Sequence, residues 1–205
     1  MSTRSTKRAD KGDNADTESL IERVALTLLA RDGVLSGINL REVADKAEVS
    51  RALVYHYYRS RRDLLRAALR RDVRDRTEQI LSGAHLPLVK RARRFFRTMI
   101  KYQNPVQLKT ILVLDGDADI VTMPLRNRAI EMYLEDVRAG HLAEDDLEAL
   151  HLTLMALVNG YLVYRDHFAA EIGAKPHELD RRVEAILGKL LSGLTPQDPQ
   201  ASRTE

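Results

Sequence analysis

The 205-residue sequence predicts an all-α fold, in which a small N-terminal head of three helices precedes a larger C-terminal helical domain. Three observations predict this fold. Apolar residues recur at helical spacing along most of the chain, and residues typical of helix N-caps precede several of these runs. Breaks rich in Gly or Pro separate the runs, with no strand-like alternation between them. These breaks fall at residues 83–87, 104–105, 115–124, 140 and 173–176.

The elements follow in order from the N-terminus. Residues 1–16 are polar and lack periodicity, so we expect a disordered arm there. Residues 17–31 form the first helix, which packs across the head with an apolar face of Leu20, Ile21, Val24, Leu28 and Leu29. We place the head and its connecting helix at 17–81, the C-terminal domain at 82–195 and a disordered tail at 196–205.

The residues between 39 and 65 carry three helix starts in close succession. Asn39 with Glu42 is a capping-box pattern, so a short helix should begin near residue 40. Ser50 is a good N-cap for a second short helix over 51–57. Ser60 with Asp63 caps a third, longer helix. Only about three residues separate the first two helices, which is the spacing of a helix-turn-helix.

The second short helix has the chemistry of a DNA-recognition helix. Arg51, at its start, can form a bidentate pair with guanine, a contact worth about 1–3 kcal/mol of discrimination. The side chains expected to reach phosphates are Ser50, Tyr55, Tyr57 and either Arg61 or Arg62. The alternative is that the tyrosines are core residues and the arginines a solvated face, and we expect Tyr58 to be in the core.

These residues resemble the N-terminal domain of the tetracycline-repressor (TetR) family of bacterial transcription regulators, over residues 17–65. The matching residues are Asn39, Val43, Ala44, Ala47, Val49, Ser50, Val54, Tyr55, Tyr57, Tyr58, Arg61 and Leu64. The resemblance implies DNA contacts from Asn39, Ser50, Arg51, Ala52, Leu53, Tyr55, His56, Tyr57 and Arg61. The chain departs from the family pattern at Glu48, where Gly is usual. We expect a modest cost if the φ angle at Glu48 is positive.

Composition and charge agree with a DNA-binding head on a soluble protein. The net charge is only +3, divided as +1 over residues 1–16, +3 over 17–81 and −1 over 82–205. Nine arginines face three acids between residues 51 and 76, so positive charge is concentrated beside the recognition helix. The chain has no cysteine, no signal-peptide core and no apolar run that we judge long enough to span a membrane. We therefore expect a cytoplasmic protein without a membrane partner.

The last two helices predict a homodimer. Their apolar residues cover more than one helix face, so each of these helices must pack against more than one neighbouring helix. A second subunit can supply the additional neighbour. The family resemblance implies the same pairing. The expected interface residues are Leu154, Val158, Gly160, Tyr161, Val183, Ile186, Leu187, Leu190 and Leu191. The alternative is an ordinary core within one chain. A two-fold dimer would read a near-palindromic operator with half-sites about 34–36 Å apart.

The middle helices are where the resemblance places a pocket for a small organic effector. The candidate residues are Phe96, Met99, Tyr102, Leu112, Tyr133, His151, Met155 and Asn159. Aromatic and methionine side chains at helical spacing are also ordinary core residues. Lys90, Arg91, Arg93, Arg94 and Arg97 can attract an anionic effector or simply form a solvated helix face.

Two metal-like patterns do not make a site. Asp115, Asp117 and Asp119 imitate the start of a calcium loop, but Ile120 stands where that loop needs Gly. Arg126 also stands where it needs Glu. His167 and Glu171 lack a complete set of further ligands. We expect neither a metal nor a cofactor.

The sequence thus predicts a homodimeric regulator that binds double-stranded operator DNA, most simply a repressor released by a small-molecule effector. A first alternative is a DNA-binding dimer without such an effector, gated by a protein or ungated. A second is a helical-bundle enzyme, for which we find no nucleophile, metal motif or phosphate loop.

Overall fold

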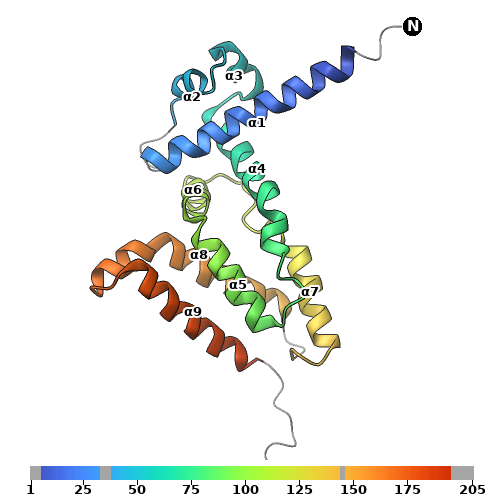
Figure 1. Cartoon of the computed structure of the whole chain (residues 1–205), viewed down its shortest axis with the longest axis vertical. Helices are drawn as coiled ribbons and strands as arrows, with labels where there is room; N and C mark the ends of the chain where they lie inside the picture. The colour runs from blue at the N-terminus through green and yellow to red at the C-terminus, as the bar shows by residue number, and fades with distance from the viewer. Residues whose placement is uncertain (1–5, 33–37, 144–145, 195–205) are drawn as a thin grey trace, which may run out of the picture. The chain divides into compact units, whose positions relative to one another are not determined.

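The computed structural model describes residues 6–32, 38–143 and 146–194, and every regular element within them is a helix. The predicted all-α class is therefore confirmed (Figure 1). The helices are α1 (Thr6–Asp32), α2 (Leu40–Lys46), α3 (Arg51–Tyr57), α4 (Arg61–Leu81), α5 (Leu88–Ile100), α6 (Gln103–Leu114), α7 (Arg126–Arg138), α8 (Leu147–Glu171) and α9 (Pro176–Ser192).

The helices belong to two compact units, each with its own core. The first unit comprises Met1–Arg76 and Gln107–Ile120. Its core is built around the fully buried side chains of Ile21, Val43, Val54 and Leu64, which come from α1, α2, α3 and α4. The first three of these helices form the head that the sequence predicts, and α4 is its connecting helix.

The second unit comprises Thr77–Val106 and Val121–Glu205. In it α5 packs against α8 and α9, α7 packs against α8, and α8 packs against α9. Phe96 of α5 and Leu162 of α8 are completely buried at the centre of its main core. The helices α4 and α6 each run from one unit into the other.

Helix α1 begins eleven residues earlier than the sequence pattern predicts. The arm expected over residues 1–16 is helical from Thr6 onward. This stretch contains no proline, and several of its residues are good helix formers. Adding a turn to an existing helix costs far less than nucleating one, so the helix extends beyond its apolar segment. Residues 1–5 and the tail expected over 196–205 lie outside the described residues.

The C-terminal half of α6 belongs with the head and not with the second unit, in which the sequence analysis placed it. Leu108 and Leu112 are buried in the core of the first unit. Leu112, one of the residues predicted to line an effector pocket, is therefore part of the core of the head. Sequence periodicity identified an apolar face on this helix but not the core that it covers.

Helix α8 is long and apolar enough, by length and composition alone, to cross a membrane. A core helix of a soluble protein can have the same length and composition, so this finding does not contradict the expectation of a protein without a membrane span. Only 22 % of its 18-residue window, which has a mean hydropathy of 1.3, is buried within the chain. Much of its apolar surface is therefore not covered by the chain's own core.

Candidate DNA-binding site

The turn between α2 and α3 is a Schellman motif, which requires a left-handed residue just beyond the end of a helix. The Val49 amide donates to the Ala44 carbonyl at 3.0 Å, and the Glu48 amide donates to the Asp45 carbonyl at 3.3 Å. Glu48 occupies the left-handed position with φ of 54°, the only non-glycine residue with positive φ among the described residues. Glu48 therefore has the positive φ angle for which we expect a conformational cost. The cost arises because the Cβ atom crowds the backbone in this conformation.

Two polar side chains cap the helices of this motif and remain exposed. The Asn39 side-chain oxygen accepts from the Arg41 amide at 2.9 Å, and the Ser50 hydroxyl accepts from the Leu53 amide at 3.1 Å. Each bond uses an acceptor only. The Asn39 amide group and the Ser50 hydroxyl hydrogen remain able to donate to a phosphate.

Helix α3 has a buried face and an exposed face. Val54 is fully buried, and Tyr58, directly after the helix, is 6 % exposed. Tyr58 is therefore in the core, as expected. Arg51, Ala52, Tyr55 and His56 are exposed. Leu53 and Tyr57 are partly buried, so they have less surface to offer to DNA.

A buried polar group holds α3 on its neighbours. The Tyr58 hydroxyl donates to Glu22 Oε1 at 3.2 Å, and Arg71 makes an ion pair with the other Glu22 oxygen. Burial and the Glu22 carboxylate raise the pKa of Tyr58 well above its usual value. Glu22 lies on α1, Arg71 lies on α4 and Tyr58 directly follows α3, so this group fixes the position of the recognition helix in the head. No sequence pattern pointed to it, because its members are 36 and 49 residues apart.

Positive charge at the ends of α3 is largely free to meet phosphates. Arg51 has a side chain that is 51 % exposed, and its nearest carboxylate, Asp45, is 3.9 Å away. Arg62 pairs with Asp115, whereas Arg61 is exposed and makes no ion pair within the described residues. Of the two arginines left open by the sequence, Arg61 is therefore the better placed to bind a phosphate.

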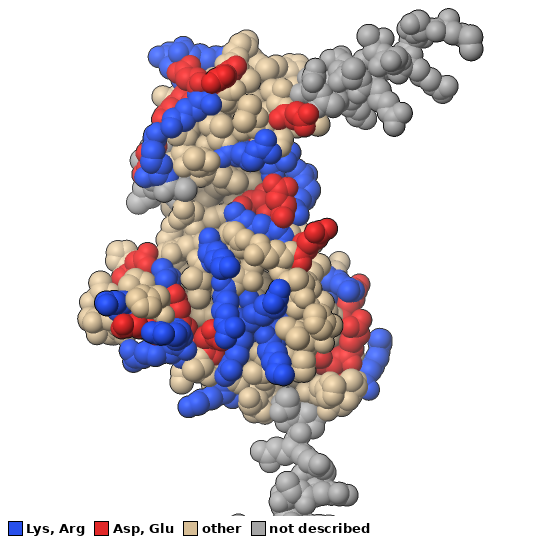
Figure 2. Space-filling view, in the orientation of Figure 1, with Lys and Arg blue, Asp and Glu red and all other residues tan. Residues whose placement is uncertain are grey.

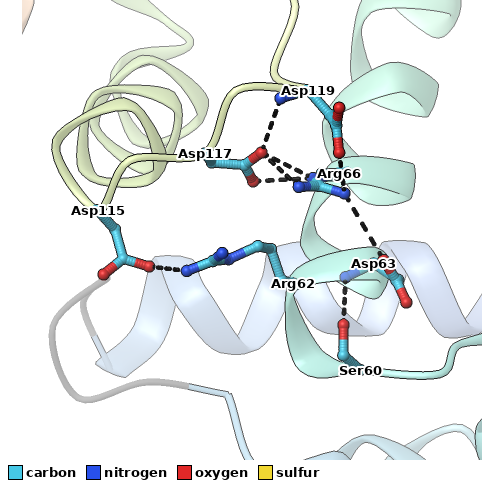
Figure 3. A network of polar contacts seen from close by, with 7 residues as sticks. All are labelled: Ser60, Arg62, Asp63, Arg66, Asp115, Asp117 and Asp119. Atoms are coloured by element: carbon cyan, nitrogen blue, oxygen red, sulfur yellow. Dashed lines mark hydrogen bonds and ion pairs between the residues drawn. The ribbon is translucent and has the colours of Figure 1, made fainter.

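The three aspartates that imitate a calcium loop instead bind arginines at the start of α4 (Figure 3). Arg66 Nε donates to both Asp117 oxygens, at 2.8 and 3.0 Å, and Arg66 Nη1 lies 3.0 Å from Asp119. The Asp117 side chain is fully buried. Its hydrogen bonds from Arg66 hold the pKa of Asp117 below its usual range. The described residues contain no group of three side chains suited to a metal.

The residues predicted to line an effector pocket are distributed over both units. Phe96 and Met99 belong to the main core of the second unit, where the Phe96 ring lies 5.4 Å from that of Tyr161. Tyr133 and His151 form a separate buried pair, with 3.4 Å between the hydroxyl and Nδ1. The remaining members lie elsewhere: Tyr102 bonds to Gln79, Met155 and Asn159 are half-buried on α8, and Leu112 is in the head.

The residues predicted to form a dimer interface differ in how exposed they are. Val158, Tyr161, Leu187 and Leu191 are buried in the core of their own chain, so they have almost no surface left for a partner. Leu154, Gly160 and Val183 are half-buried, whereas Ile186 and Leu190 are exposed. Helical periodicity showed that α8 and α9 are apolar on two faces but could not say which face stays inside the chain.

An exposed helix on a capped helix-turn-helix, with arginines at both ends, is the arrangement of a DNA-binding domain. Residues 21–68 match the family model for bacterial regulatory proteins of the tetR family. The head of the chain is therefore similar to the DNA-binding domain of tetR-family regulators.

Solved structures share the fold over most of the chain. A TetR-family regulator from Rhodococcus sp. is 16 % identical, with a TM-score of 0.68 over 89 % of this chain and 100 % of that one. A TetR-family regulator from Haemophilus influenzae is also 16 % identical, with a TM-score of 0.54 over 85 % and 96 %. A gamma-butyrolactone receptor is 20 % identical, with a TM-score of 0.51 over 90 % and 100 %. No curated protein sequence matches the chain.

Proposed function

We propose that this regulator is a homodimeric repressor that binds a near-palindromic operator through α3 and is released by a small-molecule effector. The observation that carries the DNA-binding part is the exposed face of α3, with Arg51 at its N-terminal end. It is supported by the exposed capping side chains of Asn39 and Ser50, which keep free donors. The residues proposed to contact DNA are Asn39, Ser50, Arg51, Ala52, Leu53, Tyr55, His56, Tyr57 and Arg61. Among them, Arg51 and Tyr55 offer the largest exposed side chains for base and phosphate contacts.

The test is selection of bound DNA from a random pool, followed by affinity measurements over a range of salt concentrations. Arg51→Ala should relax base preference at one position per half-site, at a cost of about 1–3 kcal/mol. Arg61→Ala should weaken all sequences alike and lower the salt slope by about one. Arg74→Ala is the matched control, because Arg74 is exposed on α4, away from α3. Enrichment of no sequence, or equal effects of Arg51→Ala and Arg74→Ala, would refute this assignment.

The dimer is proposed to form through apolar side chains of α8 and α9 that the chain itself leaves exposed. Tyr164 and Phe168 stack on each other at 5.5 Å while being 54 % and 43 % exposed. Ile186 and Leu190 are 53 % and 59 % exposed on α9. Burying such surface stabilises association by roughly 25 cal/mol per Å² before the costs of ordering.

Sedimentation analysis of Leu190→Glu tests the dimer. The variant should be monomeric at concentrations where the native protein is dimeric. Leu114→Glu is the matched control, because Leu114 is 80 % exposed but lies on α6. If both variants or neither were monomeric, this face would not be the interface.

The effector is proposed to bind in the second unit. It can release the protein from DNA only if it binds the conformation with low DNA affinity more tightly than the conformation that binds the operator. One protein of this fold is named a gamma-butyrolactone receptor, which supports a small-molecule ligand for the fold. The helix α6 supplies a connection, because it starts in the second unit and continues into the head. If no small molecule that binds the full-length protein changed its affinity for the operator, the ungated dimer would be favoured instead.

A further inference from the structure

A groove on the second unit is lined by cations without a single carboxylate. Its volume is about 450 Å³, and it lies along α5 beside the end of α4 and the loop that joins them. Figure 2 shows lysine and arginine side chains gathered on this face. The lining residues are Gln79, Leu86, Lys90, Arg93, Arg94, Arg97, Thr98 and Lys101.

Folding alone does not explain this clustering. Lys90, Arg94, Arg97 and Lys101 follow one another at spacings of four, three and four residues, so they share one face of α5. Like charges at these spacings destabilise a helix. Elsewhere in the described chain, part-buried arginines have carboxylate partners, as Arg91 has Asp136 and Arg165 has Asp180. The groove is therefore a place where positive charge is left uncompensated.

Most of the groove cations have no counter-ion. Arg97 pairs with Glu184, through bonds of 2.6 and 2.8 Å. Lys90, Arg93, Arg94 and Lys101 have no carboxylate within 4.0 Å among the described residues. Arg94 instead donates twice to the Ser82 hydroxyl, at 2.8 and 3.1 Å. This hydroxyl orients the Arg94 guanidinium without neutralising it.

Two glycines make room for the groove arginines. A Cβ on Gly188 would lie 2.2 Å from Arg93 Nη2, and a Cβ on Gly83 would lie 2.7 Å from Arg94 Cδ. Arg93 Nε is buried and has no hydrogen-bond partner. Burying a charged donor without an acceptor is unfavourable unless a ligand supplies one. The packing thus holds two guanidinium groups in fixed places beside an open volume.

We propose that this groove binds a small molecule that carries two or more linked phosphate groups. Guanidinium groups bind phosphate oxygens in bidentate pairs, and the lysines at each end add point charges. The twelve residues from Lys90 to Lys101 span about 17 Å of helix, so the stripe suits several phosphates in a row better than one isolated anion. The volume is within the range of small-ligand sites. The site is separate from the α3 surface and does not depend on whether its ligand controls DNA binding.

The test is calorimetric titration of the full-length protein with sodium tripolyphosphate at constant ionic strength, with orthophosphate as the comparison. Saturable binding should be at least about tenfold tighter for tripolyphosphate, because more of its charges meet the stripe. Titration with a nucleoside triphosphate then tells whether the organic part adds affinity. Lys90→Gln/Arg94→Gln should weaken tripolyphosphate binding at least about tenfold.

The matched control is Lys175→Gln/Arg138→Gln, which removes the same two kinds of charge from exposed positions of the same unit. Its affinity for tripolyphosphate should stay unchanged. Equal weakening by both double variants would mean a general charge effect, and absence of saturable binding would overturn the proposal outright. If Lys90→Gln/Arg94→Gln instead lost affinity for duplex DNA while tripolyphosphate did not bind, the face would be a nucleic-acid contact and the proposal would be wrong.

Discussion

Replacing Glu48 by Gly should stabilise the protein, because Glu48 holds a left-handed backbone that the Schellman turn requires. An L-residue in this conformation costs about 1–2 kcal/mol. Glycine avoids that cost but loses about 0.5–1 kcal/mol more backbone entropy on folding. The net gain expected in the free energy of unfolding is therefore about 0.5–1 kcal/mol, which corresponds to a rise in Tm of about 1–4 °C for a chain of this size.

The matched control is Glu48→Ala, which removes the same charge and side chain but keeps Cβ. Thermal unfolding followed by circular dichroism should show the gain in Glu48→Gly only. Both variants should bind operator about twofold tighter at low salt, since a unit charge ~10 Å from a phosphate contributes ~0.4 kcal/mol in water. The difference in affinity should shrink as salt rises. If Glu48→Ala were as stable as Glu48→Gly, the left-handed backbone would not be a source of strain and this reasoning would be refuted.

Three further changes test contacts within each unit. Asp117→Asn should lower Tm more than Asp115→Asn, because Asp117 is fully buried against Arg66 whereas Asp115 is 62 % exposed; equal losses would contradict this. Tyr58→Phe should cost about 1–3 kcal/mol in urea unfolding by leaving the buried Glu22 carboxylate short of a donor, and a cost near zero would show that the bond contributes nothing. Burial lowers the pKa of His151 below 6.5, so the unfolded chain binds its proton more readily; the free energy of unfolding should fall as pH drops below 6.5, and His151→Gln should flatten that fall. A pH profile unchanged in His151→Gln would assign the acid sensitivity to other groups.

Local chemistry made the head predictable from the sequence. Caps at Asn39, Ser50 and Ser60 depend on residues at most three positions away, and the structure has all three bonds. The helix class of the second unit followed from periodicity in the same way. What periodicity does not contain is which of two apolar faces meets which neighbour. Val158 and Leu190 both lie on an apolar face of a predicted helix, yet Val158 is 2 % exposed and Leu190 is 59 % exposed.

Polar contacts between residues far apart in the sequence could not be predicted for a similar reason. Arg66 and Asp117 are 51 residues apart, and each had a plausible local explanation in the sequence, one as part of a basic stretch and the other as part of a calcium-like loop. Only the fold shows that the two patterns satisfy each other. The basic stripe of α5 differs, because its spacing was visible in the sequence from the start. Its significance became clear when the structure showed how few of its members have a counter-ion.

The distribution of paired and unpaired arginines separates structural from binding roles more sharply than net charge does. Arg62, Arg66 and Arg71 lie in the most basic part of the sequence, but each is bound to a carboxylate of the head. Their charge is largely cancelled locally, so they contribute little to attracting a polyanion. Arg61 is exposed at the start of α4 without such a partner, and Arg51 is exposed at the start of α3 with only a long contact of 3.9 Å to Asp45. The excess charge that can attract DNA is therefore smaller than the count over residues 51–76 suggests. Within that stretch, the exposed arginines without an ion pair among the described residues are Arg59, Arg61, Arg70 and Arg74. A protein arranged in this way should rely more on base contacts than on general phosphate attraction, and its affinity for random duplex DNA should be low.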